Sequence, residues 1–326
     1  MSASTWFDDL PVIGYMSPAE AATKLREVGD NESAAALEAA QEAMDILSAV
    51  RQESSPVLEK YPSGTAARQS KWWPLLDKPW RYTAHTFGYL APAPLDNDQL
   101  PILPIDKISA DSRLKDSRVK ITLDHLRVAS YPGRGIHHVL LHFAAQNQAA
   151  NGAESVHFNA TYRVLEGQRA AVRGYPVFTG LHVGREGFTF KCRTINVKNE
   201  QDEQILEFLE SDVFKAGLKL LNIAHPVVAP FSEMAYGLAK GVARHNRNIA
   251  VQDIDLSLDF GSNPIGVRLA EGEYLAIQTP EKQELVWDWD DWIYDRASGQ
   301  VVNKANRRQL IPYNYLVFGI SRYDGA

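Results

Sequence analysis

The sequence predicts an α+β protein that is mainly β: an antiparallel β-sandwich of about eight or nine strands. An N-terminal helical hairpin and a helical insertion complete this fold class. Three observations favour it. Segments with a hydrophobic period of two recur from residue 118 onward, at strand length and separated by turn residues. Helix start and stop signals lie near the N-terminus, and a second helical block at 200–247 separates the earlier strands from the later ones.

The composition limits the class of protein further. The chain has 326 residues, of which 45% are hydrophobic and 23% are charged, a mixture typical of globular proteins. A formal net charge of −6 argues against a general nucleic-acid binder, whose affinity comes from a basic surface. A single cysteine excludes an internal disulfide. The first residues lack a signal-peptide pattern, and no apolar run reaches membrane-spanning length, so we expect a cytoplasmic protein.

Residues 1–50 are expected to form the helical hairpin as a first domain. Ser17 is a suitable N-cap, and Glu20 three residues later completes a capping box. Gly29 then ends the first helix. The second helix carries apolar residues at helical spacing, namely Leu37, Met44 and Leu47.

Residues 51–117 are expected to form an extended connector, because eight prolines lie between positions 56 and 104. The stretch SKWWPLLDKPWRYTAHTFGYL within it is unusually aromatic for a linker. We expect this stretch to anchor the connector on the main domain or in a partner. The candidate partner-binding residues are Trp72, Trp73, Trp80 and Tyr82.

Residues 118–326 are expected to form the sandwich domain, with the helical insertion at 200–247. Before the insertion, the strand-length segments are 118–128, 136–147, 155–165, 177–183 and 187–197. After it, they are 248–260, 265–280, 284–294 and 314–323. In the segment 187–197, Phe188, Phe190 and Cys192 share one face, so the thiol is interpreted as an inert core residue.

Four histidines superficially resemble a metal site, namely His137, His138, His142 and His157. His138 and His142 share a face of one strand but lie about 13 Å apart, too far to bind one ion directly. His157 on a neighbouring strand could pair with one of them, and two histidines without a third ligand make a weak site. Ordinary polar positions on a sheet are therefore the favoured interpretation. The chain also lacks the phosphate-loop, dinucleotide, nucleophile-elbow and zinc-protease motifs, which leaves an enzyme open but disfavoured.

The stretch WDWDDWIYD interleaves tryptophans with carboxylates. In a strand, Trp287 and Trp289 would pack inward while Asp288 and Asp290 faced solvent. Together with Asp295 these two carboxylates have the spacing of a calcium-binding loop. The second acidic loop that calcium would require is best supplied by Asp253, Asp255 and Asp259. An acidic sheet edge that discourages strand pairing is the favoured alternative.

The helical block 213–243 is apolar with sparse charges. It would present a basic face to anionic lipid through Lys215, Lys219 and Lys240. The alternative is a helical cover for an open face of the sandwich.

These observations favour a non-enzymatic binding or scaffold protein that assembles with a protein partner or with further copies of itself. No cofactor is expected, with calcium as the exception just described. The rival interpretation is a membrane-acting effector or lipid-binding protein that uses residues 213–243, with or without calcium. The third is an enzyme built around His142, His157 and neighbouring carboxylates.

Overall fold

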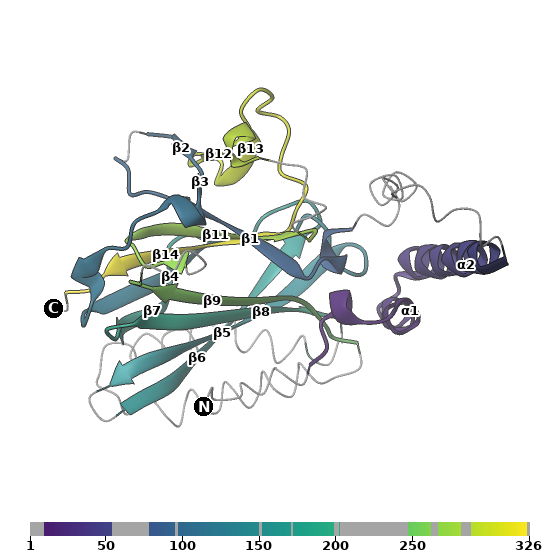
Figure 1. Ribbon diagram of the computed structural model, residues 1–326, viewed down its shortest axis with the longest axis horizontal. Helices are drawn as coiled ribbons and strands as arrows, with labels where there is room; N and C mark the ends of the chain where they lie inside the picture. Colours follow the sequence, from purple (N-terminus) through teal and green to yellow (C-terminus); the bar gives the residue numbers. More distant parts are fainter. Residues whose placement is uncertain are drawn as a thin grey trace.

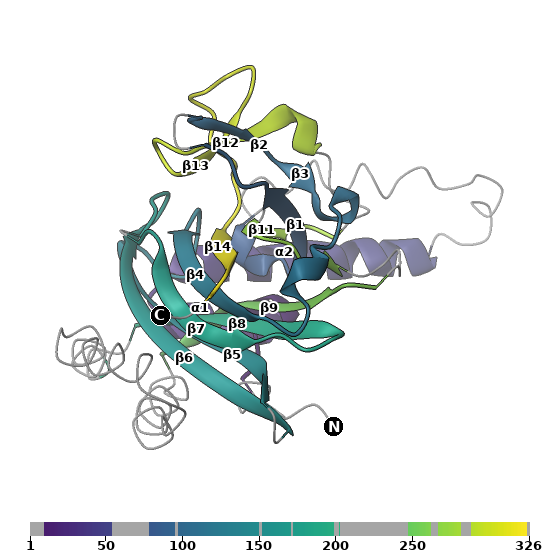
Figure 2. The same cartoon turned by 90° about the vertical axis from the view of Figure 1, so that its left-hand side faces the viewer.

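The computed structural model describes residues 10–53, 78–94, 97–149, 152–170, 172–198, 202, 247–261, 267–281 and 288–324. Its body is a sandwich of two β-sheets, with two helices at one end and a small third sheet on the outside (Figure 1). Figure 2 shows the same layers from the side, with the curved strands β5, β6 and β8 in the sheet drawn below the other two. The predicted fold class is confirmed.

The upper sheet of the sandwich has six strands in the order β3-β1-β11-β14-β4-β7, all antiparallel to their neighbours. These strands are β1 (Ala84–Leu90), β3 (Leu103–Pro104), β4 (Arg118–Arg127), β7 (Tyr175–His182), β11 (Gly272–Thr279) and β14 (Tyr315–Arg322).

The lower sheet has five strands in the order β10-β9-β8-β5-β6, and the short β10 runs parallel to β9. They are β5 (Ile136–Ala149), β6 (Gly152–Leu165), β8 (Gly187–Val197), β9 (Ile249–Asp259) and β10 (Val267–Arg268). The third sheet contains β2 (Gln99–Pro101), β12 (Trp292–Asp295) and β13 (Gln300–Asn303). In the described part of the chain, the two main sheets contain eleven strands, of which nine have seven residues or more; the prediction was about eight or nine.

Two hydrophobic cores hold the three layers together. The larger core lies between the two main sheets, where alternation turns Val139, Leu141 and Phe143 of β5 inward. Cys192 lies in the same core, as predicted, and burial raises the pKa of its thiol well above the usual value. The smaller core joins the outer face of the six-stranded sheet to the third sheet, and Trp289 is part of it.

The helical hairpin is present as predicted, and it packs on the sandwich. Its helices are α1 (Pro18–Glu27) and α2 (Asn31–Glu53). Elsewhere, the described residues include five short 3-10 helices: η2 (Ile13–Tyr15), η4 (Pro79–Arg81), η5 (Ile105–Lys107), η6 (Ser112–Leu114) and η7 (Trp289–Asp291). The Ser17–Glu20 capping box forms, and Gly29 ends α1 with a φ of 78°. The buried hairpin residues belong to the larger core, namely Ala21, Ala22, Leu25, Ala34 and Leu37.

The connector expected over residues 51–117 is not extended throughout. Its residues Ala84–Leu90 form β1, which pairs along its whole length with β11 inside the six-stranded sheet. Phe87 and Tyr89 alternate toward the larger core, which gives this strand its stability. The neighbouring prolines, which favoured a connector, flank the strand and leave its hydrogen bonds intact.

The prediction of a continuous strand over residues 284–294 is wrong at the centre of that segment, because Trp289–Asp291 form the 3-10 helix η7. The Asp288 side chain caps it by accepting a hydrogen bond from the backbone N–H of Asp290 at 3.0 Å. Trp289 is buried while Asp288 and Asp290 are exposed, so the predicted burial of these three residues is confirmed. The local structure that produces it is a 3-10 helix and not a strand. Trp287 lies outside the described residues.

The helical insertion expected at 200–247 lies almost entirely outside the described residues, with only Asp202, Arg247 and their neighbour Asn248 at its borders placed. Within the part of the chain that is described, no helix combines the length and the hydropathy needed to cross a bilayer.

Candidate functional site

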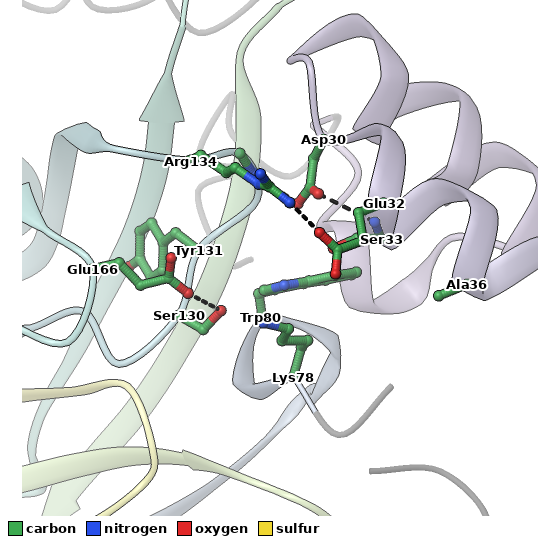
Figure 3. A pocket seen from close by; sticks show the side chains of 11 residues that line it. Asp30, Glu32, Ser33, Ala36, Lys78, Trp80, Ser130, Tyr131, Arg134 and Glu166 are labelled. Atoms are coloured by element: carbon green, nitrogen blue, oxygen red, sulfur yellow. Dashed lines mark hydrogen bonds and ion pairs between the residues drawn. The ribbon is translucent and has the colours of Figure 1, made fainter. Parts of the chain in front are cut away.

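A pocket of about 260 Å³ lies where the helical hairpin meets the sandwich (Figure 3). Four separate parts of the chain form it: the start of α2, the turn at η4, the loop that leaves β4 and the loop that leaves β6. The residues that line it are Asp30, Glu32, Ser33, Ala36, Lys78, Trp80, Ser130, Tyr131, Gly133, Arg134 and Glu166.

Asp30 holds the hairpin against the loop that follows β4. Its Oδ1 atom accepts a hydrogen bond from the backbone N–H of Ser33 at 3.2 Å, so Asp30 is the N-cap of α2. Its Oδ2 atom accepts from the backbone N–H of Gly133 at 3.1 Å. Gly133 has a φ of 89°, a conformation that favours glycine, so the loop can turn toward the carboxylate. One buried carboxylate therefore joins the start of α2 to the loop after β4.

A second set of hydrogen bonds fixes Ser130 and Glu166, which lie in the loops after β4 and β6. Asn314 accepts from the backbone N–H groups of Ala129 and Ser130 at 2.8 and 3.0 Å. Its amide group donates to the carbonyl oxygen of Ser130 at 2.9 Å. The Ser130 hydroxyl, held in this way, donates to Glu166 Oε1 at 2.9 Å (Figure 3). Glu166 therefore presents its carboxylate at the rim in a set orientation.

The floor of the pocket consists of two aromatic side chains that are part of the core. Trp80 is 2% exposed and lies in η4. The Tyr131 hydroxyl donates to Thr194 Oγ1 and accepts from the Gln252 amide, both at 2.8 Å. Burial raises the pKa of Tyr131 far above its ordinary value, so the hydroxyl stays protonated at neutral pH. The floor is rigid and unsuited to proton transfer.

The charges around the pocket are mixed and slightly negative, with three carboxylates against the two cations Lys78 and Arg134. Arg134 forms an exposed ion pair with Glu32, which a charged ligand can displace at small cost. The described lining residues include neither histidine nor cysteine, and Ser130 with Glu166 is the hydrogen-bonded hydroxyl and carboxylate among them. The charged residues of this arrangement can bind a charged group.

Of the four aromatic residues predicted to bind a partner, two lie at or beside this pocket and two lie outside the described residues. Trp80 lines the pocket and packs within the chain's own core. Tyr82 lies beside it, with its ring 6.0 Å from that of Tyr313 and its carbonyl oxygen accepting from Gln278 at 2.6 Å. Trp72 and Trp73 lie outside the described residues. The same holds for the predicted membrane contacts Lys215, Lys219 and Lys240.

The structure does not bring the two predicted calcium-binding segments together. Asp288 caps η7, and Asp295 Oδ1 accepts from the backbone N–H of Ser298 at 2.8 Å, both within or beside the third sheet. The acidic residues of β9, in the five-stranded sheet, form ion pairs with cations: Asp253 with Arg193, Asp255 with Lys191 and Asp259 with Arg268. In the described ranges, no three histidine, cysteine or carboxylate side chains are grouped as metal ligands. Calcium binding stays a prediction.

The histidines separate as the strand period requires. His137 faces the core, where the centre of its ring lies 5.8 Å from that of Tyr131. Burial lowers the pKa of His137 to about 4. His142 faces the other side of the sheet, where it lies beside His157 of β6. The pairing of His157 with one β5 histidine is therefore observed.

The sequence alone did not indicate several of the residues that line the pocket, among them Lys78, Ser130, Arg134 and Glu166. They are ordinary polar residues on three distant segments. The one local signal is the glycine-rich loop around Gly133, which indicates a special backbone turn but not what it contacts.

The chain matches no protein-family model, and no curated protein or solved structure is significantly similar to it.

Proposed function

We propose that the protein is a non-enzymatic binding protein that assembles with a protein partner. The contact surface is the outer half of α2, residues 38–53, together with the pocket at the base of this helix.

The length of α2 beyond the body supports this proposal most strongly. The helix has 23 residues and is about 34 Å long at 1.5 Å per residue. Leu37 is its last residue whose described side chain is buried, and residues 38–43 and Asp45 are exposed or half-buried. Figure 1 shows the helix extending away from the sheets. The outer half of α2, residues 38–53, is only slightly longer than the roughly 12–15 residues below which an isolated helix is marginal in water, and a partner can supply packing for it.

The sequence of α2 indicates how the partner would bind. Met44 and Leu47 continue the helical spacing that begins at Leu37. A narrow apolar stripe of this kind fits a hydrophobic groove on another protein. The three carboxylates of the pocket, against two cations, favour a basic partner side chain next to that groove.

The proposal is tested by replacing Leu47 with glutamate in the full chain. Ala39→Glu is the matched control, because it adds the same charge to the outer half of α2 at an exposed position outside the stripe. In extract of the cells that express it, the wild-type chain should migrate on size exclusion well above its 36.4 kDa monomer mass, and so should Ala39→Glu. Leu47→Glu should migrate as the monomer.

Purified protein separates the two kinds of partner. A mass of 36.4 kDa by light scattering assigns the larger particle to another protein, and twice that mass assigns it to a second copy. If wild type and Leu47→Glu migrate alike in extract, α2 is not the contact surface.

A further inference from the structure

Two histidines of neighbouring strands meet on the outer face of the five-stranded sheet. His142 on β5 pairs with Asn159 on β6, and Ala144 pairs with His157. His142 and His157 are therefore diagonal neighbours on one face, opposite the core residues Leu141 and Phe143. His142 is 2% exposed, and His157 is half-buried.

The separation of the two rings matches that of two ligands on one metal ion. His142 Nε2 lies 3.4 Å from His157 Nδ1, and the ring centres are 5.3 Å apart with planes inclined at 25°. Two imidazole nitrogens about 2.05 Å from a tetrahedral ion are about 3.3 Å apart, and their ring centres about 5.2 Å apart. The same contact is a hydrogen bond between the rings when one of the two facing nitrogens carries a proton. When neither does, the two nitrogens and the two ring centres have about the spacing that one shared ion requires.

Asn159 orients His142 for this role. Its amide oxygen lies 2.9 Å from His142 Nδ1, and because that oxygen only accepts, Nδ1 carries the proton. The lone pair of His142 is therefore on Nε2, the atom that faces His157. A hydrogen bond from the second ring nitrogen to an oxygen acceptor is the usual support of a metal-binding histidine. His157 needs only to carry its proton on Nε2, so binding requires no net loss of a proton.

We propose that His142 Nε2 and His157 Nδ1 together bind a divalent transition-metal ion of the zinc, copper and nickel class. Imidazole nitrogen is a preferred ligand of these ions. Within the described residues these two side chains are the protein ligands, and water can complete the coordination. The ion would tie β6, the last strand of the sheet, to β5 by a bond that does not depend on the backbone ladder.

The charge nearest His142 is Arg193 on β8, directly opposite it, which forms an ion pair with Asp253. Arg193 still disfavours positive charge at His142, so the imidazole nitrogens and not the surrounding charges must supply the affinity for the ion. Both imidazoles are neutral near pH 7, since burial lowers the pKa of His142 to about 3 and also lowers the pKa of His157. Neutral imidazole is the form that binds metal.

The test uses the untagged full chain after treatment with a chelator. Calorimetric titration with Zn²⁺ measures affinity, and the visible absorption of Co²⁺ reports the ligand set. His157→Gln should bind Zn²⁺ at least tenfold more weakly than wild type. His138→Gln is the matched control, because His138 lies on the same strand face as His142 but about 13 Å away, and it should bind like wild type.

A variant of the supporting residue separates a metal site from a merely structural pair. Asn159→Ala should weaken Zn²⁺ binding tenfold or more, while Asn159→Asp, which still accepts the proton of His142 Nδ1, should retain it. Circular dichroism and urea midpoints establish that each variant is folded. If folded wild type binds none of Zn²⁺, Co²⁺, Ni²⁺ and Cu²⁺, or if His157→Gln binds Zn²⁺ as tightly as wild type, the proposal is wrong.

Discussion

Gly88 lies where the third sheet rests on the six-stranded sheet, so adding one methyl group there tests how that layer is packed. A Cβ atom at this position would lie 2.6 Å from Trp289 Cη2 and 2.6 Å from Ile102 Cγ2. Unstrained carbon contacts are about 3.5–4.0 Å, so each contact would be short by about 1 Å. The φ of Gly88 is not positive, so alanine is acceptable to the backbone itself. Any loss of stability therefore reports the contact with the third sheet.

We expect Gly88→Ala to lower the free energy of unfolding by about 1–3 kcal/mol, the usual cost of overpacking. Trp289→Ala should lower it by about 3–5 kcal/mol, because this tryptophan is 9% exposed and truncation leaves a cavity. In the double variant the new methyl group can occupy part of that cavity. The two losses should therefore fall short of additivity by about 1 kcal/mol or more.

Urea denaturation followed by far-ultraviolet circular dichroism measures all four proteins without relying on tryptophan fluorescence. Thr86→Ser on the same strand is a suitable control, since it adds no atoms and keeps the hydroxyl that hydrogen-bonds to Thr279. Additive losses, or a Gly88→Ala variant as stable as wild type, would show that the third sheet does not pack on β1 as described.

Four further outcomes follow from the core, the turns and the acidic residues. Leu25→Ala should cost about 2–5 kcal/mol in urea denaturation, because this hairpin residue is 0% exposed in the larger core; a loss below 1 kcal/mol would place the hairpin outside it. Burial lowers the pKa of His85 and His137 to about 4, below their ordinary 6.5, so the unfolded chain binds more protons. The urea midpoint should therefore fall as pH drops from 6.5 to 4, and a flat profile would contradict those burials. Asp288→Asn should change stability by less than about 0.5 kcal/mol, since asparagine also caps helices. Calcium should leave the melting temperature unchanged, and a rise that Asp288→Asn abolishes would restore the calcium hypothesis.

Sequence patterns predicted the parts of the fold that depend on local periodicity. The strands β4 to β8 and the Ser17 capping box follow directly from alternation and capping chemistry. The strand β1 was missed because flanking prolines outweighed the short alternation of Phe87 and Tyr89. The η7 turn was missed because an aspartate that caps and an aspartate that alternates look the same in sequence.

The two sites depend on information that no local pattern contains. The pocket joins Asp30, Ser130 and Glu166, which meet only after the hairpin has packed on the sandwich. The meeting of His142 and His157 depends on the register of β5 and β6. A slip of one residue would move His157 to the opposite face of the sheet, so the residue types alone could not establish the pair.

Site-specific photo-crosslinking from α2 tests the central claim most directly. A photoreactive side chain is placed at position 47, on the predicted apolar stripe, or at position 42, an exposed position about 140–160° around the helix from Leu37, Met44 and Leu47. In cells, the account predicts a discrete crosslinked product from position 47, larger than the 36.4 kDa chain, and little or none from position 42. Equal products from both positions, or none from position 47, would contradict assembly through α2.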